Sequence, residues 1–196
     1  MSFYLIVDDV SWVARMVPLG VKLIQLRIKD SRGREIGRQL REALKICADH
    51  GAQLVVNDYW QIAIEEGCEF VHLGQEDLDI ADLNVIRSAG LKLGVSTHDH
   101  EELSRVLPLK PDYVALGPIY PTRLKAMRFA PQGLARISEW KKLIGEIPLV
   151  AIGGLNIERA TLALQAGADI VSVVTDVTLH ADPEARVREW LKAVPE

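Results

Sequence analysis

The sequence alternates eight times between a short apolar run and a longer segment of helical period. The runs predict strands at 4–8, 23–29, 54–58, 70–74, 91–97, 112–117, 148–154 and 169–175. Segments between them, such as GREIGRQLREALKICADHG and NIERATLALQAGA, repeat apolar residues every three or four positions. Continuous apolar strands are typical of a parallel sheet that is buried on both faces. Right-handed crossovers then allow an open doubly wound sheet or a closed barrel, and eight units favour a single-domain (β/α)8 TIM barrel over 1–196.

Composition narrows the class of ligand. The chain has 196 residues, of which 48% are hydrophobic, and 23 basic against 27 acidic residues give a net charge of −4. That charge argues against a nucleic acid or an anionic membrane as the main partner. No apolar run approaches the roughly 20 residues of a membrane helix, and the start MSFYLIVDDVSW lacks the pattern of a signal peptide. We therefore expect a cytoplasmic protein, with Cys47 and Cys68 as reduced, non-catalytic thiols.

Polar residues and glycines gather at the carboxyl ends of most of the expected strands. In a (β/α)8 barrel the strand C-termini meet at one face, and the loops after them build the site. The residues so placed are Asp8 and Asp9; Gln25, Arg27 and Lys29; Asn57 and Asp58; Gln75 to Asp77; Ser96 to His98; Thr122 and Lys125; Gly153 and Gly154; and Val174 and Thr175. The sequence thus predicts a polar site at this end of the barrel.

Three groups within that set have a chemical interpretation. Gln25, Arg27 and Lys29 alternate along one expected strand, so their donors face one volume and suit an anionic or polar ligand. Asp58 and Asp77 follow neighbouring strands, and two carboxylates about 4 Å apart would repel by roughly 4 kcal/mol at an effective dielectric of 20. A cation between them would remove that repulsion, and Mg2+ fits best because it takes one or two carboxylates, water and phosphate oxygens. For either aspartate alone, the alternative is a helix N-cap.

The glycine pair in AIGGLNIERA follows the seventh expected strand, and SVVTDVT includes the end of the eighth. Barrels often bind phosphate there through backbone N–H groups. A glycine pair alone could be only a tight turn, so its position after strand seven strengthens the interpretation.

Together these blocks resemble the thiamine-phosphate synthase family. LIQLRIKD, VVNDYWQIAIEEGCEFVHLGQEDL, LKLGVSTHD, VALGPIYPT and VAIGGLNIERA occur in the family's order over nearly the whole chain. The resemblance implies a (β/α)8 barrel and a Mg2+-assisted, dissociative transfer. In that reaction, hydroxymethylpyrimidine diphosphate loses pyrophosphate, and its methylene carbon joins the ring nitrogen of hydroxyethylthiazole phosphate. The product is thiamine phosphate.

The resemblance also implies a role for each matching position. Asp58 and Asp77 match the ligands of one Mg2+ per subunit. The positions that match the pyrimidine diphosphate site are Gln25, Leu26, Arg27, Ile28, Lys29, Asn57, Ser96 and Lys125. Those that match the thiazole phosphate site are Thr122, Arg123, Leu124, Gly154, Val174 and Thr175. Arg27, Lys29, Lys125 and Ser96 are the expected catalytic residues, and the segment 121–132 is the expected lid.

Several positions depart from the family pattern. Leu124 stands where relatives commonly carry a second threonine, so a hydroxyl donor near the expected phosphate is missing. Asp176 stands where a small residue is usual, and we expect it to point away from the phosphate and cap the last helix. The first expected strand starts almost at once, which leaves the cover of the barrel floor open, and a second copy of the chain is one alternative.

The histidines suggest structural roles. His98 and His100 form an HxH pattern, but Asp99 with Glu102 predicts a capping box that opens the next helix, and no third metal ligand is evident. His72 lies within an expected strand and is interpreted as a core histidine with satisfied hydrogen bonds.

Three rival functions stay open at this point. A thiazole tautomerase would not need the paired aspartates, Asp58 and Asp77. A non-catalytic thiazole-phosphate sensor would bind ligand and release no pyrophosphate. A sugar-phosphate isomerase would be expected to place a catalytic base at a strand end. Fold alone does not decide among them.

Overall fold

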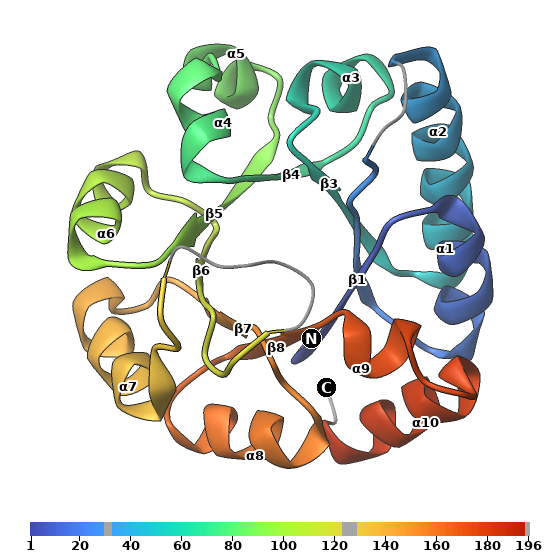
Figure 1. Cartoon of the computed structure of the whole chain (residues 1–196). Coiled ribbons are helices and arrows are strands. Elements are labelled where there is room, and N and C mark those ends of the chain that lie inside the picture. The colour runs from blue at the N-terminus through green and yellow to red at the C-terminus, as the bar shows by residue number, and fades with distance from the viewer. Residues whose placement is uncertain (30–32, 123–128, 195–196) are drawn as a thin grey trace.

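A computed structural model describes residues 1–29, 33–122 and 129–194, and within them eight parallel strands close into a barrel in the order β1 to β8 (Figure 1). The strands are β1 (Phe3–Val7), β2 (Leu23–Leu26), β3 (Gln53–Asn57), β4 (Phe70–Leu73), β5 (Lys92–Thr97), β6 (Tyr113–Leu116), β7 (Leu149–Ile152) and β8 (Ile170–Val173). β1 pairs with both β2 and β8, which closes the ring. The predicted (β/α)8 single-domain barrel is confirmed.

Helices surround the barrel on its outer side (Figure 1). They are α1 (Val10–Met16), α2 (Gly33–His50), α3 (Trp60–Glu65), α4 (Gln75–Ile80), α5 (Leu83–Ser88), α6 (His100–Val106), α7 (Gly133–Ile144), α8 (Ile157–Gln165), α9 (Thr175–Thr178) and α10 (Pro183–Ala193), with short 3-10 turns at Val17–Leu19 and Leu107–Leu109. Side-chain caps open several of them: Asp9, Asp82, Asp99, Asn156 and Asp182 each accept a hydrogen bond from a backbone N–H of the following helix.

The two faces of each strand bury different kinds of side chain. The outward residues, such as Leu5, Leu26 and Val95, join one large apolar cluster with the inner faces of the helices. The inward residues form a smaller cluster that fills the barrel toward the amino-terminal ends of the strands. It consists of Tyr4, Leu23, Val55, Phe70, Tyr113, Ala115 and Val150. This alternation follows from the two-residue period of a strand, and it leaves the inward positions nearest the strand C-termini for polar residues.

Several strands are shorter than expected. β2 ends at Leu26, whereas the sequence predicted it to run to residue 29. The amide of Arg27 still donates to the carbonyl of Val7 at 2.7 Å, so the ladder continues for one bond and then stops. Arg27 and Lys29 therefore lie just above the barrel on the segment that leaves it.

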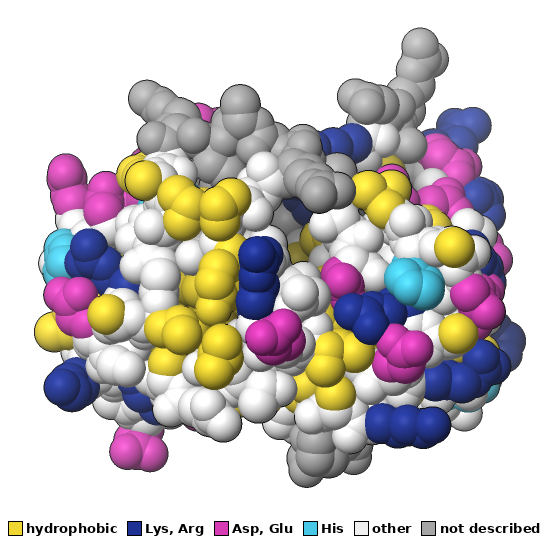
Figure 2. All heavy atoms as spheres, turned by 60° about the horizontal axis from the view of Figure 1, so that its bottom comes forward, with side chains coloured by type: hydrophobic (Ala, Val, Ile, Leu, Met, Phe, Trp, Pro, Cys, Tyr) yellow, Lys and Arg dark blue, Asp and Glu magenta, His cyan; other side chains and the backbone are white. Residues whose placement is uncertain are grey.

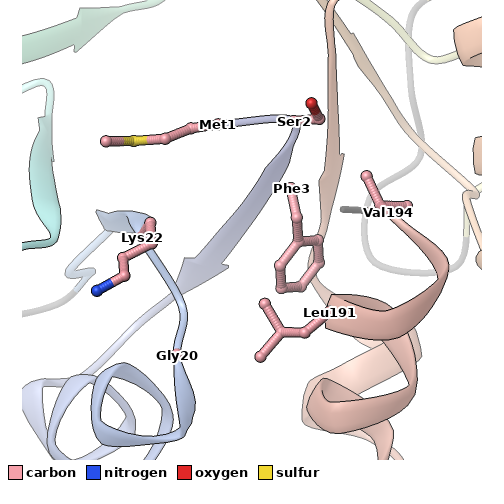
Figure 3. A pocket seen from close by; sticks show the side chains of 7 residues that line it. All are labelled: Met1, Ser2, Phe3, Gly20, Lys22, Leu191 and Val194. Atoms are coloured by element: carbon pink, nitrogen blue, oxygen red, sulfur yellow. The ribbon is translucent and has the colours of Figure 1, made fainter. Parts of the chain in front are cut away.

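The opposite, amino-terminal end carries a shallow hollow of about 210 Å3 (Figure 3). Its lining residues are Met1, Ser2, Phe3, Gly20, Lys22, Leu191 and Val194. Phe3 stacks on Trp190 of α10, with ring centroids 5.2 Å apart, and supports this end of the barrel. The hollow lies at the start of β1, away from the strand C-termini, so we assign it no part in the chemistry.

Two surface observations bear on possible partners. Within the described ranges, no helix is both long enough and apolar enough to cross a membrane. On the face that Figure 2 shows, basic and acidic side chains are interspersed, so this face presents no continuous basic surface.

Candidate active site at the strand C-termini

Asp58 follows directly after β3 and adopts a backbone conformation that is unusual for a residue with a side chain. Its φ is +65°, in the left-handed region. Its amide donates to the carbonyl of His72 at 2.9 Å, which ties this turn to β4. The side-chain amide of the buried Asn57 donates to Asp58 Oδ2 at 2.5 Å. These contacts hold the Asp58 carboxylate at the mouth of the barrel.

Asp77 reaches the same place from the first turn of α4. It lies four residues beyond the end of β4, so it is a helix residue and not the strand-end residue that the sequence suggested. A Cβ atom on Gly74 would stand 3.1 Å from Asp77 Oδ2, which shows that this carboxylate folds back over the start of the helix.

The carboxyl groups of Asp58 and Asp77 lie close enough to share a hydrogen bond, and burial together with this contact raises the pKa of Asp58. Its pKa is raised from 3.8 to about 6, first by burial and then by the charge of Asp77 and a hydrogen bond with the Asp77 carboxyl. Arg27 and Asn57 act in the opposite direction, which places the Arg27 guanidinium close enough to influence the pair.

This arrangement fits Mg2+. The ionised form of Asp58 is disfavoured beside a second carboxylate. A small divalent cation between the two carboxylates would offset their repulsion and stabilise both in the ionised form. Among the described residues, no group of three or more His, Cys, Asp and Glu side chains is placed to hold a metal, so a protein cage of the kind that zinc prefers is not found there. Asp58 and Asp77 would leave further coordination positions to water and to ligand oxygens, as Mg2+ commonly requires.

Alternate residues of the segment from Gln25 to Lys29 point to opposite sides of the barrel wall. Gln25 is buried inside the barrel, Arg27 is half-buried at its mouth, and Lys29 is exposed. Leu26 and Ile28, which the resemblance also assigned to substrate binding, bury their side chains in the outer apolar cluster. Only their backbone groups remain candidates for contact with a ligand.

Ser96 lies on β5 and faces inward, where its Oγ is 2.9 Å from His72 Nε2. His72 Nδ1 is 2.7 Å from the hydroxyl of Tyr113, so both ring nitrogens have partners and the predicted satisfied core histidine is confirmed. Burial, with a smaller effect from the Arg27 charge, lowers the pKa of His72 to about 4. The side-chain amide of Gln75 donates to the carbonyl of Ser96 at 2.6 Å and fixes the end of this strand.

Two buried tyrosines at the site were not predicted from the sequence. Tyr4 Oη lies 3.1 Å from Tyr113 Oη and 2.7 Å from Gln25 Nε2. Burial raises the pKa of both phenols, so both are neutral. Their inward position in expected strands was the one available signal, because a tyrosine inside a barrel has to find a partner for its hydroxyl.

The expected phosphate site is partly described. Gly154 has a φ of +65°, and a Cβ there would stand 2.5 Å from the carbonyl oxygen of Pro121, so glycine is required for this turn to close against the preceding loop. Val174 precedes α9 and Thr175 is its first residue, which turns backbone N–H groups toward the same end of the barrel. Thr122, which follows Pro121, is half-buried. Residues 123–128, which include Arg123, Leu124 and Lys125 and make up half of the expected lid, lie outside the described residues.

Asp176 points away from the expected phosphate position, as predicted. Its Oδ2 accepts hydrogen bonds from Arg186 Nε and from Trp190 Nε1, both at 2.8 Å, and both donors belong to α10. The prediction that it caps the last helix is wrong, because Asp182 caps α10 by accepting from the amide of Ala185. Asp176 instead holds the side of that helix against α9.

The HxH pattern belongs to a helix start. Asp99 accepts from the amide of Glu102, and Glu102 in turn accepts from the amide and the ring of His98. His100 pairs with Glu139 of α7. The capping interpretation of this segment is confirmed.

Comparison with known proteins agrees with this geometry. The family model described as thiamine monophosphate synthase matches residues 3–177. A thiamine-phosphate synthase of Rhizobium etli is 59% identical over 191 residues, which cover 97% of this chain and 94% of that protein. One of an Enterobacter species is 43% identical, covering 98% of this chain and 91% of the other.

Solved structures extend the comparison. A thiamine phosphate pyrophosphorylase from Pyrococcus furiosus superposes with a TM-score of 0.87 at 26% identity, covering 98% of this chain and 94% of that one. A 3-hexulose-6-phosphate synthase superposes with a TM-score of 0.73 at 16% identity, covering 99% of this chain and all of the other, which shows a shared fold alone. On the match to the family model and the identity to its members, the chain belongs to the thiamine monophosphate synthase family.

Proposed function

We propose that this chain joins hydroxymethylpyrimidine diphosphate to hydroxyethylthiazole phosphate with release of pyrophosphate, and that Asp58 and Asp77 hold the Mg2+ on which the reaction depends. The observation that carries the proposal is the facing pair of carboxyl groups beside Arg27, within a chain of this family. A thiazole tautomerase would have no use for such a pair, and a sensor would not need to stabilise a leaving group.

Departure of pyrophosphate concentrates negative charge on the leaving group, and positive charge placed beside it lowers the barrier. A bound Mg2+ would supply such charge from the Asp58 and Asp77 side. Arg27, half-buried at the barrel mouth, supplies a guanidinium with several N–H donors, and Lys29 adds a second cation from the exposed end of the same segment. Lys125 is proposed as a third on the basis of the family resemblance.

The proposed chemistry needs neither a protein nucleophile nor a strong general base. The electron-rich aminopyrimidine tolerates positive charge on its methylene carbon, and the attacking thiazole nitrogen carries no proton. The thiols fit this description, because burial raises the pKa of Cys47 to about 11 and that of Cys68 to about 12, so both are protonated and inert. What the site has to do is orient the two substrates and exclude water, which would otherwise trap the cation.

We place the thiazole phosphate at the turn of Gly154 and at the start of α9, where Val174 and Thr175 present backbone N–H groups. Glycine at position 154 lets the backbone come close to a phosphate without an intervening side chain. Thr122, Arg123 and Leu124 are proposed to complete this subsite. A cytoplasmic location is also part of the proposal, as both thiols are free and buried.

The test is pyrophosphate release with both substrates, in the presence of Mg2+ and after its removal with EDTA. We expect turnover that needs both substrates and the metal, and we expect Asp58→Asn to abolish it. A chain that binds thiazole phosphate and releases no pyrophosphate would be a sensor, and one that isomerises a thiazole phosphate without Mg2+ would be a tautomerase. Diffraction from a crystal soaked with pyrophosphate and Mg2+ should place the metal between Asp58 and Asp77.

A further inference from the structure

A continuous chain of buried hydrogen bonds crosses the inside of the barrel and joins two residues of the proposed pyrimidine site. It runs from Gln25 on β2 through Tyr4 on β1, Tyr113 on β6 and His72 on β4 to Ser96 on β5. The four links measure 2.7 Å, 3.1 Å, 2.7 Å and 2.9 Å. We call these five residues the barrel chain. Its two ends, Gln25 and Ser96, stand on strands that are not neighbours in the sheet.

A glycine and two ring contacts hold Tyr113, the middle residue of the barrel chain, in place. A Cβ atom on Gly94 would stand 2.1 Å from Tyr113 Cζ, so only a glycine at this inward position of β5 lets the phenol lie where it does. The His72 ring stacks on the Tyr113 ring, with centroids 5.6 Å apart and planes 13° from parallel. Tyr4 meets Tyr113 edge to face. A simple apolar core would need none of these arrangements.

With the Gln25 amide donating to Tyr4, as the structure has it, only one direction satisfies every proton of the barrel chain. Gln25 donates an amide N–H to the Tyr4 oxygen, so the proton of Tyr4 goes to the next oxygen, that of Tyr113. The proton of Tyr113 then goes to His72 Nδ1, because the neutral imidazole has one acceptor nitrogen. His72 Nε2 carries the ring proton and donates it to Ser96 Oγ.

That direction decides what the two ends can offer to a ligand. Ser96 already accepts from His72, so its own hydroxyl proton is available as a donor. Gln25 directs its N–H toward Tyr4, so its carbonyl oxygen is available as an acceptor. The opposite assignment requires the Gln25 amide to turn over and all four links to reverse together. Reversal of only some links would leave a buried hydroxyl proton without an acceptor, which is costly.

We propose that Tyr4, Tyr113 and His72 are positioning residues that set the hydrogen-bond polarity of the site, so that the Ser96 hydroxyl donates and the Gln25 carbonyl accepts. They act through these two residues and are not assigned contacts with substrate.

The matching ligand edge has an N–H donor toward Gln25 and an unprotonated ring nitrogen toward Ser96. A 4-aminopyrimidine has such an edge, with its exocyclic amine beside a ring nitrogen. The 4-oxo analogue has the reverse, a carbonyl oxygen beside a ring N–H, and would set acceptor against acceptor and donor against donor. The inference therefore rests on the proposed function and deepens it: the barrel chain selects the amino form of the pyrimidine.

The experiment compares binding of free 4-amino-2-methyl-5-hydroxymethylpyrimidine with binding of its 4-oxo analogue by calorimetry. The key variant is Tyr113→Phe, which keeps the ring over Gly94 and removes the hydroxyl that joins the two halves. Tyr4→Phe is the second variant, should the first fail to fold. Thr97→Val is the matched control, because Thr97 is also a buried residue of β5 with a bonded hydroxyl, and it faces the outer layer, where it donates to the Ala115 carbonyl.

We expect the wild-type chain and Thr97→Val to prefer the amino compound by about tenfold or more, the ratio that one mismatched buried hydrogen bond produces. Tyr113→Phe should bring the ratio close to one and raise the KM for the pyrimidine diphosphate, with the KM for thiazole phosphate unchanged. A Tyr113→Phe chain that loses stability and keeps the wild-type ratio would overturn the inference, since the hydroxyl would then be structural only. So would a wild-type chain that binds both pyrimidines equally or neither.

These outcomes separate the inference from the reaction. If the wild-type chain shows the preference and forms no thiamine phosphate, the proposed reaction fails while the inference stands. If it forms thiamine phosphate and Tyr113→Phe keeps the preference, the reaction stands and the inference fails.

Discussion

Removing one carboxylate of the Asp58 and Asp77 pair should stabilise the protein in the absence of metal while it abolishes Mg2+-dependent turnover. The raised pKa of Asp58, about 6 in place of 3.8, corresponds to about 3 kcal/mol against its ionised form if fully expressed at neutral pH. Asp58 is only partly buried, and water screens part of this effect, so we expect about 1–2 kcal/mol. For a domain of this size that is a rise in Tm of about 2–8 °C.

A substitution at Asp58 changes the backbone energy as well as the charge, because Asp58 has a positive φ. Asparagine is better tolerated than aspartate at a φ of +65°, so Asp58→Asn combines a backbone gain with the electrostatic one. Asp77→Asn removes the repulsion from a residue in a helix, without the backbone gain. The burial of Asp58, the largest cause of its raised pKa, remains in this variant, so we expect the lower end of that range, about 1 kcal/mol. Asp79→Asn is the control, since Asp79 lies on the same helix as an exposed residue paired with Arg105, and its loss should change the free energy of unfolding by less than about 1 kcal/mol.

The pH dependence has a definite sign. The folded-state pKa of Asp58 lies above its ordinary value, so the stability linked to its proton is fully present below about pH 4 and is lost as the pH rises through about 6. The Tm difference between Asp77→Asn and the wild-type chain should therefore be largest at pH 7 to 8 and disappear near pH 4.

The assay is thermal unfolding in EDTA from pH 4 to 8, repeated with millimolar Mg2+. Added Mg2+ should raise the Tm of the wild-type chain at pH 7.5 and lose its effect below about pH 6, where protons compete for Asp58. It should leave Asp77→Asn unchanged. An Asp77→Asn chain that is less stable than wild type at pH 7.5 in EDTA, or a difference that does not vary with pH, would refute the reasoning.

Four further predictions concern single positions. Arg27→Gln should lower kcat by about 100- to 1,000-fold, measured by pyrophosphate release, because a fixed donor to the leaving group is lost; a change in the KM for thiazole phosphate alone would contradict this role. Leu124→Thr should lower the KM for thiazole phosphate and leave kcat intact, because it adds a hydroxyl donor; an equal or higher KM would contradict it. Asp176→Ala should cost about 2–3 kcal/mol in urea unfolding, as it removes the acceptor for two hydrogen bonds from α10, without changing the KM for thiazole phosphate. Gly94→Ala should cost about 3 kcal/mol or more, because the added methyl group overlaps the Tyr113 ring; a stability equal to wild type would show that the ring moves freely.

The barrel could be predicted from the sequence because its signal is repeated eight times. Each apolar strand followed by a helical segment supports the others, so an error at one boundary does not change the fold. The boundaries of the strands were harder to predict. β2 ends at Leu26 because the hydrogen-bond ladder stops after the bond between Arg27 and Val7, and the sequence has no turn-forming residue there that would predict this end.

The candidate site was predictable where its residues follow directly after a strand. Asp58 and Asn57 are adjacent in sequence and in space, and the structure brings Asp77 to them from the next unit. The link between Tyr4 and Tyr113 was not predictable, because the two are 109 residues apart and only the closure of the barrel brings them together. Asp176 was wrongly predicted to cap the last helix for a similar reason, since its partners are the side chains of Arg186 and Trp190 on the side of α10.

Because any Cβ atom at position 94 would overlap the Tyr113 ring, the residues at positions 94 and 113 can change in evolution only together. A lineage could acquire any side chain at 94 only after the aromatic ring at 113 had been replaced by something smaller, and that first step would disconnect Gln25 from Ser96. Among relatives the two positions should therefore covary, with glycine at the first wherever tyrosine stands at the second.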